Sequence, residues 1–213
     1  KNYPQSGTTY VSGGTDLYVQ HADNLINNTV YLITENETLK GIKIEDESCI
    51  IGAGTTVSEL WNHKELNAIF PKLKTYLKLV SSEQIRNMSS IGGNFVNASP
   101  IGDLSIFFLA LNSNITLQNK AGSLRTLFLK DFFKAYKILD IKADERIINI
   151  AFTVPKVDHK FNFEKVSKRT HLDIASVNTA LYIGLDQDHI SFVHLAIGGV
   201  PPTPLYLIET CQF

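Results

Sequence analysis

The sequence lacks the features by which several functional classes are recognised. Its 20 basic and 21 acidic side chains give a formal net charge of −1, so no broad basic face for nucleic acid or anionic lipid is expected. Its longest unbroken apolar run, Ile106 to Leu111, is far shorter than the roughly twenty residues that span a membrane. Neither nucleic acid nor a membrane is therefore an expected partner.

Cysteine is also scarce, and the usual catalytic and metal-binding motifs are missing. Cys49 and Cys211 lack the paired spacing of an iron–sulfur or cysteine-rich zinc site. The six histidines show no metal-ligand spacing, and neither GxSxG nor HExxH occurs. We therefore predict no catalytic residue and no metal site on this chain. A bound cofactor would have to supply any redox chemistry.

The first residues contain no apolar core of the kind that a signal peptide needs. Together with the two lone cysteines, this absence favours an intracellular, cytoplasmic protein. With 213 residues and 44% hydrophobic composition, the chain is expected to form one large or two small domains around an ordinary core.

The pattern of apolar residues predicts an α+β fold without repeats or linkers. A capping box at Thr56 and Glu59 and a 3.6-residue period from Leu73 to Val80 predict helices. Pro71 is expected in the first turn of the second of these helices. The predicted strands are 8–12, 30–33, 42–45, 115–117, 127–129, 146–154, 161–165, 177–185 and 190–197, and the further predicted helices are 17–22 and 103–111.

Three glycine clusters could bring backbone amides close to an anion. The first, residues 12–16, lies between a predicted strand and a predicted helix, so amides and the helix N-terminus can point at one group. The second, Gly52-Ala53-Gly54, is a weak dinucleotide fingerprint because Val57 stands at the third glycine position. A simple strand-to-helix turn explains the second cluster better.

The third cluster is the most unusual one. Residues 84–103 combine two adjacent glycines with several serines and asparagines, an arginine and an aspartate. A purely structural loop seldom needs so many small and hydrogen-bonding groups. An elaborate turn rich in asparagine and serine remains the alternative to a binding loop.

These segments resemble one known family. Residues 12–17, Ser-Gly-Gly-Thr-Asp-Leu, are similar to the Ala-Gly-Gly-Thr-Asp-Leu loop of the FAD-binding medium subunits of molybdenum hydroxylases, such as carbon monoxide dehydrogenase and xanthine dehydrogenase. Residues 84–94 and 98–104 resemble that family's second signature, residues 165–175 its third, and Gly198-Gly199-Val200 its later glycine turn. The motifs follow the family's order over nearly the whole chain.

The resemblance implies a PCMH-type FAD-binding fold with three parts: an N-terminal α/β lobe (1–51), a larger α+β middle lobe (52–170) and the start of a C-terminal lobe (171–213). Relatives usually have elements before the first loop and after Val200, which implies a fragment or an incomplete third lobe. Ser12 in place of alanine and Ser90 in place of threonine are mild departures.

The resemblance also implies site residues for non-covalently bound FAD. Two glycine segments would hold the pyrophosphate, Asp103 would accept hydrogen bonds from cofactor hydroxyls, Lys165 would lie toward the flavin, and Ile148 would be an apolar neighbour of the ring. Ile85 and Arg86 are expected to brace the second segment rather than to contact FAD. The pyrophosphate residues are Ser12, Gly13, Gly14, Thr15, Asp16 and Leu17, with Ser90, Ile91, Gly92, Gly93 and Asn94.

The implied function is that of an oxidoreductase subunit for electron transfer. Molybdopterin and 2Fe-2S clusters would lie on partner subunits, and electrons would pass through FAD on this chain to NAD or another acceptor. The alternatives are a stand-alone FAD-dependent oxidase of the same fold superfamily and a non-catalytic nucleotide-binding module. The oxidase would need a general base or a covalent flavin link, for which the sequence offers no convincing candidate.

Overall fold

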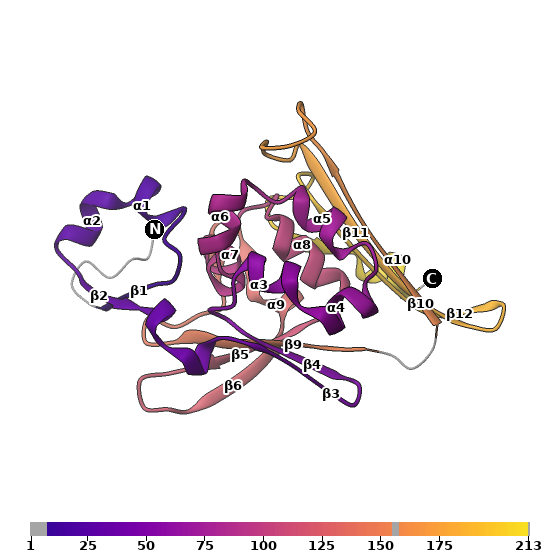
Figure 1. Cartoon of the computed structure of the whole chain (residues 1–213). Helices are drawn as coiled ribbons and strands as arrows, with labels where there is room; N and C mark the ends of the chain where they lie inside the picture. The colour runs from indigo at the N-terminus through magenta and orange to yellow at the C-terminus, as the bar shows by residue number, and fades with distance from the viewer. Residues whose placement is uncertain (1–7, 155–157, 213) are drawn as a thin grey trace.

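The structure, a computed structural model, describes residues 8–154 and 158–212 and confirms the α+β class (Figure 1). The elements form a small N-terminal group, a five-stranded sheet covered by helices, and a four-stranded sheet. Residues 1–7, on which the prediction about a signal peptide rests, lie outside the described residues.

The N-terminal group is built on two short parallel strands, β1 (Thr8–Val11) and β2 (Thr29–Leu32). Parallel strands need a crossover, and helical turns supply it here, as the sequence predicts. After β2 the chain makes two 3₁₀ turns before it enters the next sheet. The helical elements are α1 (Leu17–Gln20), α2 (Ala22–Ile26), η1 (Ile33–Glu35) and η2 (Glu37–Leu39).

The middle sheet has the strand order β3-β4-β9-β5-β6, with every neighbouring pair antiparallel. Alternating side chains decide which face of the sheet is buried. Ile115 and Leu117 of β5 are fully buried, while Asn114, Thr116 and Gln118, which alternate with them, are half-exposed. Helices cover that face (Figure 1). The strands are β3 (Ile42–Glu45), β4 (Ser48–Gly52), β5 (Asn114–Gln118), β6 (Leu124–Phe128) and β9 (Arg146–Thr153).

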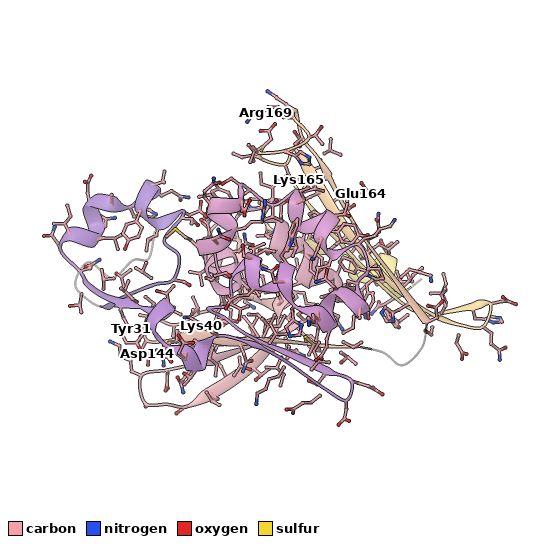
Figure 2. The ribbon with its side chains drawn as sticks, in the orientation of Figure 1. Tyr31, Lys40, Asp144, Glu164, Lys165 and Arg169 are labelled. Carbon is pink, nitrogen blue, oxygen red and sulfur yellow. The ribbon has the colours of Figure 1, made fainter. Side chains whose placement is uncertain are left out.

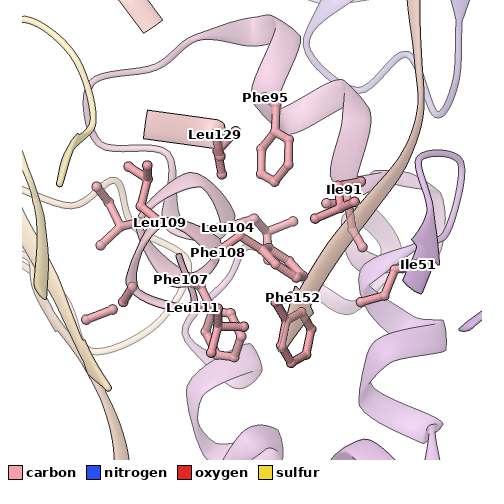
Figure 3. Packing of buried hydrophobic residues seen from close by; sticks show 14 of the residues in the cluster. Ile51, Ile91, Phe95, Leu104, Phe107, Phe108, Leu109, Leu111, Leu129 and Phe152 are labelled. Atoms are coloured by element: carbon pink, nitrogen blue, oxygen red, sulfur yellow. The ribbon is translucent and has the colours of Figure 1, made fainter. Parts of the chain in front are cut away.

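The helical layer packs around α8, whose residues from Leu104 onward are all buried. Burial on every side explains why the longest apolar run of the sequence falls in this helix. Phe107 and Phe108 of α8 meet Phe152 of β9 in the core (Figure 3). The helices are α3 (Val57–Asn62), α4 (Lys64–Ile69), α5 (Leu73–Lys78), α6 (Glu83–Met88), α7 (Ile91–Asn97), α8 (Asp103–Ala110) and α9 (Leu129–Phe132).

A second antiparallel sheet, with the order β10-β11-β12-β13, packs on the other side of α8. A short hairpin, β7 and β8, connects α9 to β9. The sheet strands are β10 (Asp158–Val166), β11 (Val177–Asp186), β12 (His189–Gly198) and β13 (Leu205–Tyr206), the hairpin strands are β7 (Phe133–Ala135) and β8 (Ile138–Leu139), and α10 (Ile208–Gln212) packs against β12.

Most predicted elements are present, and the capping box at Thr56 and Glu59 forms both of its hydrogen bonds. Several details differ from the prediction. Pro71 precedes the N-cap of α5 instead of lying in its first turn, and Val80 lies beyond the end of that helix. Leu129 starts α9 rather than continuing the strand before it. The glycine pair, expected in a loop, lies in the first turn of α7.

The lobe boundaries at 51/52 and 170/171 stay a prediction. Strand pairing divides the elements at other positions than the predicted lobes do. Strands β3 and β4 belong to the middle sheet, and β10 pairs with β11 of the last sheet. By pairing alone, the N-terminal group ends before residue 42 and the last sheet begins at residue 158.

Candidate functional site

The first glycine segment, residues 12–16, connects β1 to α1. Gly14 has a φ of +66°, and a Cβ there would lie 2.3 Å from the ring of Tyr18. Position 13 also has no room for a side chain, because a Cβ there would lie 1.8 Å from the carbonyl oxygen of Met88. The backbone conformation requires glycine at position 14, and close packing requires glycine at position 13.

The backbone amides of this segment are open. Within the described residues, the N–H groups of Gly13, Gly14, Thr15 and Asp16 donate no hydrogen bond to another part of the chain. The hydroxyl of Ser12 is buried and also has no partner in the part of the chain that the structure describes. Buried amides and hydroxyls without partners are rare in folded proteins, and those nearer the surface face a ligand or water. The segment therefore offers a row of donors to an external acceptor.

The second glycine segment is organised differently, because its amides already have partners. The N–H of Ile91 donates to the carbonyl of Thr55 (3.1 Å), that of Gly92 to the carbonyl of Ala53 (2.9 Å), and that of Gly93 to the hydroxyl of Ser90 (3.1 Å). These bonds hold the start of α7 against residues 53–55. The segment consequently contributes shape rather than a set of free donors.

The two adjacent glycines of α7 face different surroundings. A Cβ on Gly92 would lie 2.9 Å from the Cβ of Ala53, so glycine permits the close approach of α7 to that segment. Gly93 is exposed, and a Cβ there would meet the Ser90 hydroxyl at 2.9 Å and no other atom within 4 Å. The bare backbone of Gly93 thus borders open space.

The structure brings the two segments together. The contact of Gly13 with Met88 joins the first loop to the turn just before α7. Like that of Ser12, the Ser89 hydroxyl in that turn is buried and has no partner among residues 8–154 and 158–212. Arg86 stabilises the same region: its guanidinium donates to the carbonyls of Val80 (3.0 Å) and Ser81 (2.7 Å) and lies over the Trp61 ring. Bracing by Arg86 agrees with the structural role expected for it.

Asp103 and Lys165 form a buried ion pair. The Lys165 ammonium lies 2.7 Å from the Asp103 carboxylate and also donates to the Leu79 carbonyl (2.9 Å). The second carboxylate oxygen accepts from the Asn178 amide at 2.8 Å. Burial raises the pKa of Asp103 above its ordinary value, although Lys165 and Asn178 favour its charged form. Lys165 lies near the end of β10, and Arg169 lies in the loop that follows this strand (Figure 2).

Sequence reasoning missed Asn178, which connects this pair to the last sheet. Asn178 is 1% exposed, and a Cβ on Gly198 would lie 2.3 Å from its side-chain oxygen. Its position in β11 is on the same face as the buried Ala180 and Tyr182. A polar residue on the buried face of a predicted strand was the signal that could have identified it.

Ile148 lies in a different part of the molecule. It borders a groove of about 470 Å³ together with Leu39, Lys40, Ile50 and Arg146. The guanidinium of Arg146 lies over the rings of two N-terminal tyrosines, Tyr10 (5.6 Å) and Tyr31 (5.7 Å). Figure 2 shows Tyr31 and Lys40 near the N-terminal group and Lys165 on the opposite side of the helices. The predicted residues therefore surround an extended region rather than one compact pocket.

Neither a metal-binding cluster nor a membrane-spanning helix is found in the part of the chain that the structure describes. No group of three histidine, cysteine, aspartate or glutamate side chains is placed to hold a metal ion. No helix there is long and apolar enough to cross a membrane.

Comparison with known proteins gives matches along the whole chain. Residues 2–156 match the family described as the FAD binding domain in molybdopterin dehydrogenase, and residues 163–213 match the CO dehydrogenase flavoprotein C-terminal domain. The glyceraldehyde dehydrogenase medium chain of Sulfolobus acidocaldarius is 31% identical over 172 residues, which cover 80% of this chain and 60% of that relative.

Two further comparisons agree. Xanthine dehydrogenase/oxidase of Gallus gallus is 29% identical over 158 residues, which cover 73% of this chain but 12% of that protein. The chain thus spans between about an eighth and three fifths of these relatives. A chain of CO dehydrogenase from Oligotropha carboxidovorans superimposes with a TM-score of 0.87 at 24% identity, covering 98% of this chain and 72% of the other, which establishes the fold. The chain belongs to the family of FAD-binding domains of molybdopterin dehydrogenases, as its motifs predicted.

Proposed function

We propose that this chain is the FAD-binding, electron-transfer part of a molybdenum-containing hydroxylase or dehydrogenase. Its partners would be a subunit with 2Fe-2S clusters and a molybdopterin subunit, with NAD or another molecule as the electron acceptor. The family match supports this assignment. A cytoplasmic location belongs to the proposal, and the free thiols of Cys49 and Cys211 agree with a reducing compartment.

The single observation that carries the proposal is the set of open amides in residues 13–16, in a loop whose Gly13 packs against Met88 and Ser89 just before α7. A pyrophosphate needs several converging N–H donors and a surface without side chains. The unpaired hydroxyls of Ser12 and Ser89 are further donors beside the same contact. The residues present therefore fit a dinucleotide cofactor. When bound, FAD would supply reversible electron transfer.

Under this proposal, residues 12–17 and 90–94 hold the pyrophosphate and its surroundings. Asp103 is already oriented by Lys165 and Asn178, and each of its carboxylate oxygens can accept a further hydrogen bond from a cofactor hydroxyl. Lys165 would face the flavin end, and Ile148 would pack beside a ring of the cofactor. Prior pairing of Asp103 lowers the ordering cost of binding, because its rotamer is already selected.

The test is the visible absorption spectrum of the purified chain, before and after adding FAD, followed by heat release of any bound flavin. The Gly93→Val variant places a side chain in the open space over the first turn of α7, so we expect it to abolish FAD retention in a folded protein. Ala121→Val, which also introduces a valine at an exposed position, is the control. Unchanged flavin content in folded Gly93→Val would contradict the proposed clamp, and a wild-type chain that never binds FAD would contradict the function.

A further inference from the structure

An arginine that no motif singles out connects the N-terminal group to the middle sheet. Arg146 begins β9, and its guanidinium lies over the rings of Tyr10 in β1 (5.6 Å) and Tyr31 in β2 (5.7 Å). The same guanidinium donates to the Gln118 side-chain oxygen at 3.0 Å, and Gln118 is its register partner in β5. Arg146 therefore contacts both strands of one sheet while a strand of the other sheet holds it.

The two tyrosines form one surface for this cation. Tyr10 and Tyr31 are register partners in the parallel pair of β1 and β2, and their rings meet edge to face with 5.6 Å between centroids. A guanidinium within about 6 Å of an aromatic centroid is attracted by the negative face of the ring. Because the two rings belong to different strands, Arg146 attracts both strands at the same register position.

The N-terminal group has little apolar core of its own. Among its described residues, α1, α2 and β2 contribute no buried side chain, and the buried side chains of β1 are Thr9 and Val11. A two-stranded sheet is only marginally stable by itself in water. The position of β1 relative to the middle sheet therefore depends on contacts between the two, such as that of Arg146 with the tyrosines.

The contact lies directly beside the first glycine segment. Tyr10 is two residues before Ser12, where this segment begins, and β1 ends at Val11. On its other side the segment packs through Gly13 against Met88. Fixing Tyr10 consequently fixes the strand from which the open amides of residues 13–16 emerge. Donors that are oriented before a ligand arrives bind it more tightly, because less conformational freedom is lost on binding.

We propose that Arg146 is a positioning residue for the FAD pyrophosphate site and acts through Tyr10 on the first glycine segment. The inference rests on the proposed function, because it concerns the same cofactor at the same segment. It adds to the site a residue of the middle sheet that lies outside every glycine motif. The competing explanation is direct contact with the cofactor, because Arg146 also borders the groove that contains Ile148.

The test measures the dissociation constant of FAD for the full 213-residue chain, by quenching of flavin fluorescence. Arg146→Met keeps a long side chain and removes the cation from both rings. Since a cation–π contact at a partly exposed site is weak, we expect the Kd for FAD to rise about 3- to 10-fold. Arg146→Lys keeps a cation over the rings and should restore most of the affinity. Tyr10→Leu, which removes one ring, should weaken FAD binding in the same way as Arg146→Met.

A double-mutant cycle separates positioning from direct contact. If Arg146 acts through the ring of Tyr10, Arg146→Met should change the Kd little in a chain that already carries Tyr10→Leu. Full additivity of the two changes, or normal FAD binding by Tyr10→Leu, would favour direct contact and overturn positioning. Hydrogen exchange of the unliganded chain gives an independent measurement. The amides of β1 and β2 should exchange faster in Arg146→Met than in wild type.

Lys130→Met is the matched control, because Lys130 also lies over two rings, those of Phe128 (4.7 Å) and Tyr206 (5.0 Å), outside the N-terminal group. This variant should bind FAD as wild type does. Equal FAD affinity of wild type and Arg146→Met would overturn the inference about Arg146 alone, whatever the effect on thermal stability. Failure of the wild-type chain to bind FAD would instead overturn the proposed function.

Discussion

At the scale of single residues, two adjacent glycines of one motif perform different tasks. Gly92 allows α7 to approach Ala53, whereas Gly93 borders open space. Both fall in one family signature, so the sequence motif does not distinguish them. The difference appears when a side chain is placed at each position: it meets packed atoms at Gly92 and mainly solvent at Gly93.

This difference predicts opposite effects of two alanine substitutions on stability. Gly92→Ala is expected to destabilise the unliganded chain by about 1–3 kcal/mol, because overpacking forces α7 away from Ala53. Gly93→Ala is expected to leave the free energy of unfolding unchanged or to raise it by up to about 1 kcal/mol, because alanine favours the helix. Urea unfolding of both variants measures the difference. Equal destabilisation of the two would show that the packing difference is absent.

The buried pair of Asp103 and Lys165 is the second residue-scale feature. Lys165→Met would leave the carboxylate buried beside Asn178 without a cation, and we expect a loss of about 3–5 kcal/mol. Asp103→Leu with Lys165→Met removes both charges and should cost clearly less than the sum of the two single changes. A double-mutant cycle by denaturant unfolding provides the measurement. Simple additivity would mean that the pair contributes no coupling.

At the scale of elements, a charge network connects β6 to the segment before β9. Arg125 of β6 forms two hydrogen bonds of 2.7 Å with the Glu145 carboxylate and another with the Asp140 carbonyl. These bonds lower the pKa of Glu145 from 4.5 to about 2, with the Arg125 hydrogen bond as the largest cause. A bidentate pair of this geometry holds the loop between β8 and β9 in place against β6.

The lowered pKa of Glu145 predicts how stability depends on pH. Above pH 4.5 the carboxylate is charged in both states and its full contribution is present. As pH falls from about 4.5 to about 2, the unfolded chain binds the proton first and the contribution is lost. Because Arg125 is partly exposed and solvent screens the pair, we expect the charged Glu145 to contribute about 2 kcal/mol to the free energy of unfolding. Glu145→Gln should lower stability at pH 7 and flatten the slope between pH 5 and pH 3 in unfolding experiments. An unchanged slope in that variant would contradict the expectation.

At the scale of the whole molecule, α8 connects two sheets that follow each other in the chain. Phe107 of α8 lies 4.5 Å, between ring centroids, from Phe161 of β10. Tyr76 of α5 donates to the Phe161 carbonyl at 2.8 Å. The helical layer and the last sheet therefore share one apolar core. Such a shared core holds Asp103 and Lys165 in contact although 62 positions separate them in the sequence.

The proposed partners lead to an expectation about the native assembly. Purification of the chain from its source, by an affinity tag on the native gene, should recover an iron–sulfur protein and a molybdopterin protein in fixed proportion. The reason is that the proposed electron transfer needs iron–sulfur and molybdopterin centres, which the proposal assigns to partner subunits. Recovery of a fully active enzyme that consists of this polypeptide alone would favour a stand-alone oxidase.

The sequence by itself determined the α+β class, most strands and helices, and the membership of the FAD-binding family. Periodicity and capping residues are local signals, and glycine motifs retain their order along the chain, so both can be read without a structure. The same is true of the absence of cysteine clusters. Residue roles inside those motifs remain predictions.

The tertiary structure decided which groups meet and which are already satisfied. It paired Asp103 with Lys165 and Asn178, placed Ile148 in a separate groove, and showed that the amides of α7 have partners while those of residues 13–16 do not. It also brought Lys137 to the end of α7, 40 positions from Asn97 in the sequence. The contacts of Asp103 with Lys165 and of Lys137 with Asn97 join segments that lie far apart in the sequence, and no periodicity or motif of a single segment encodes them.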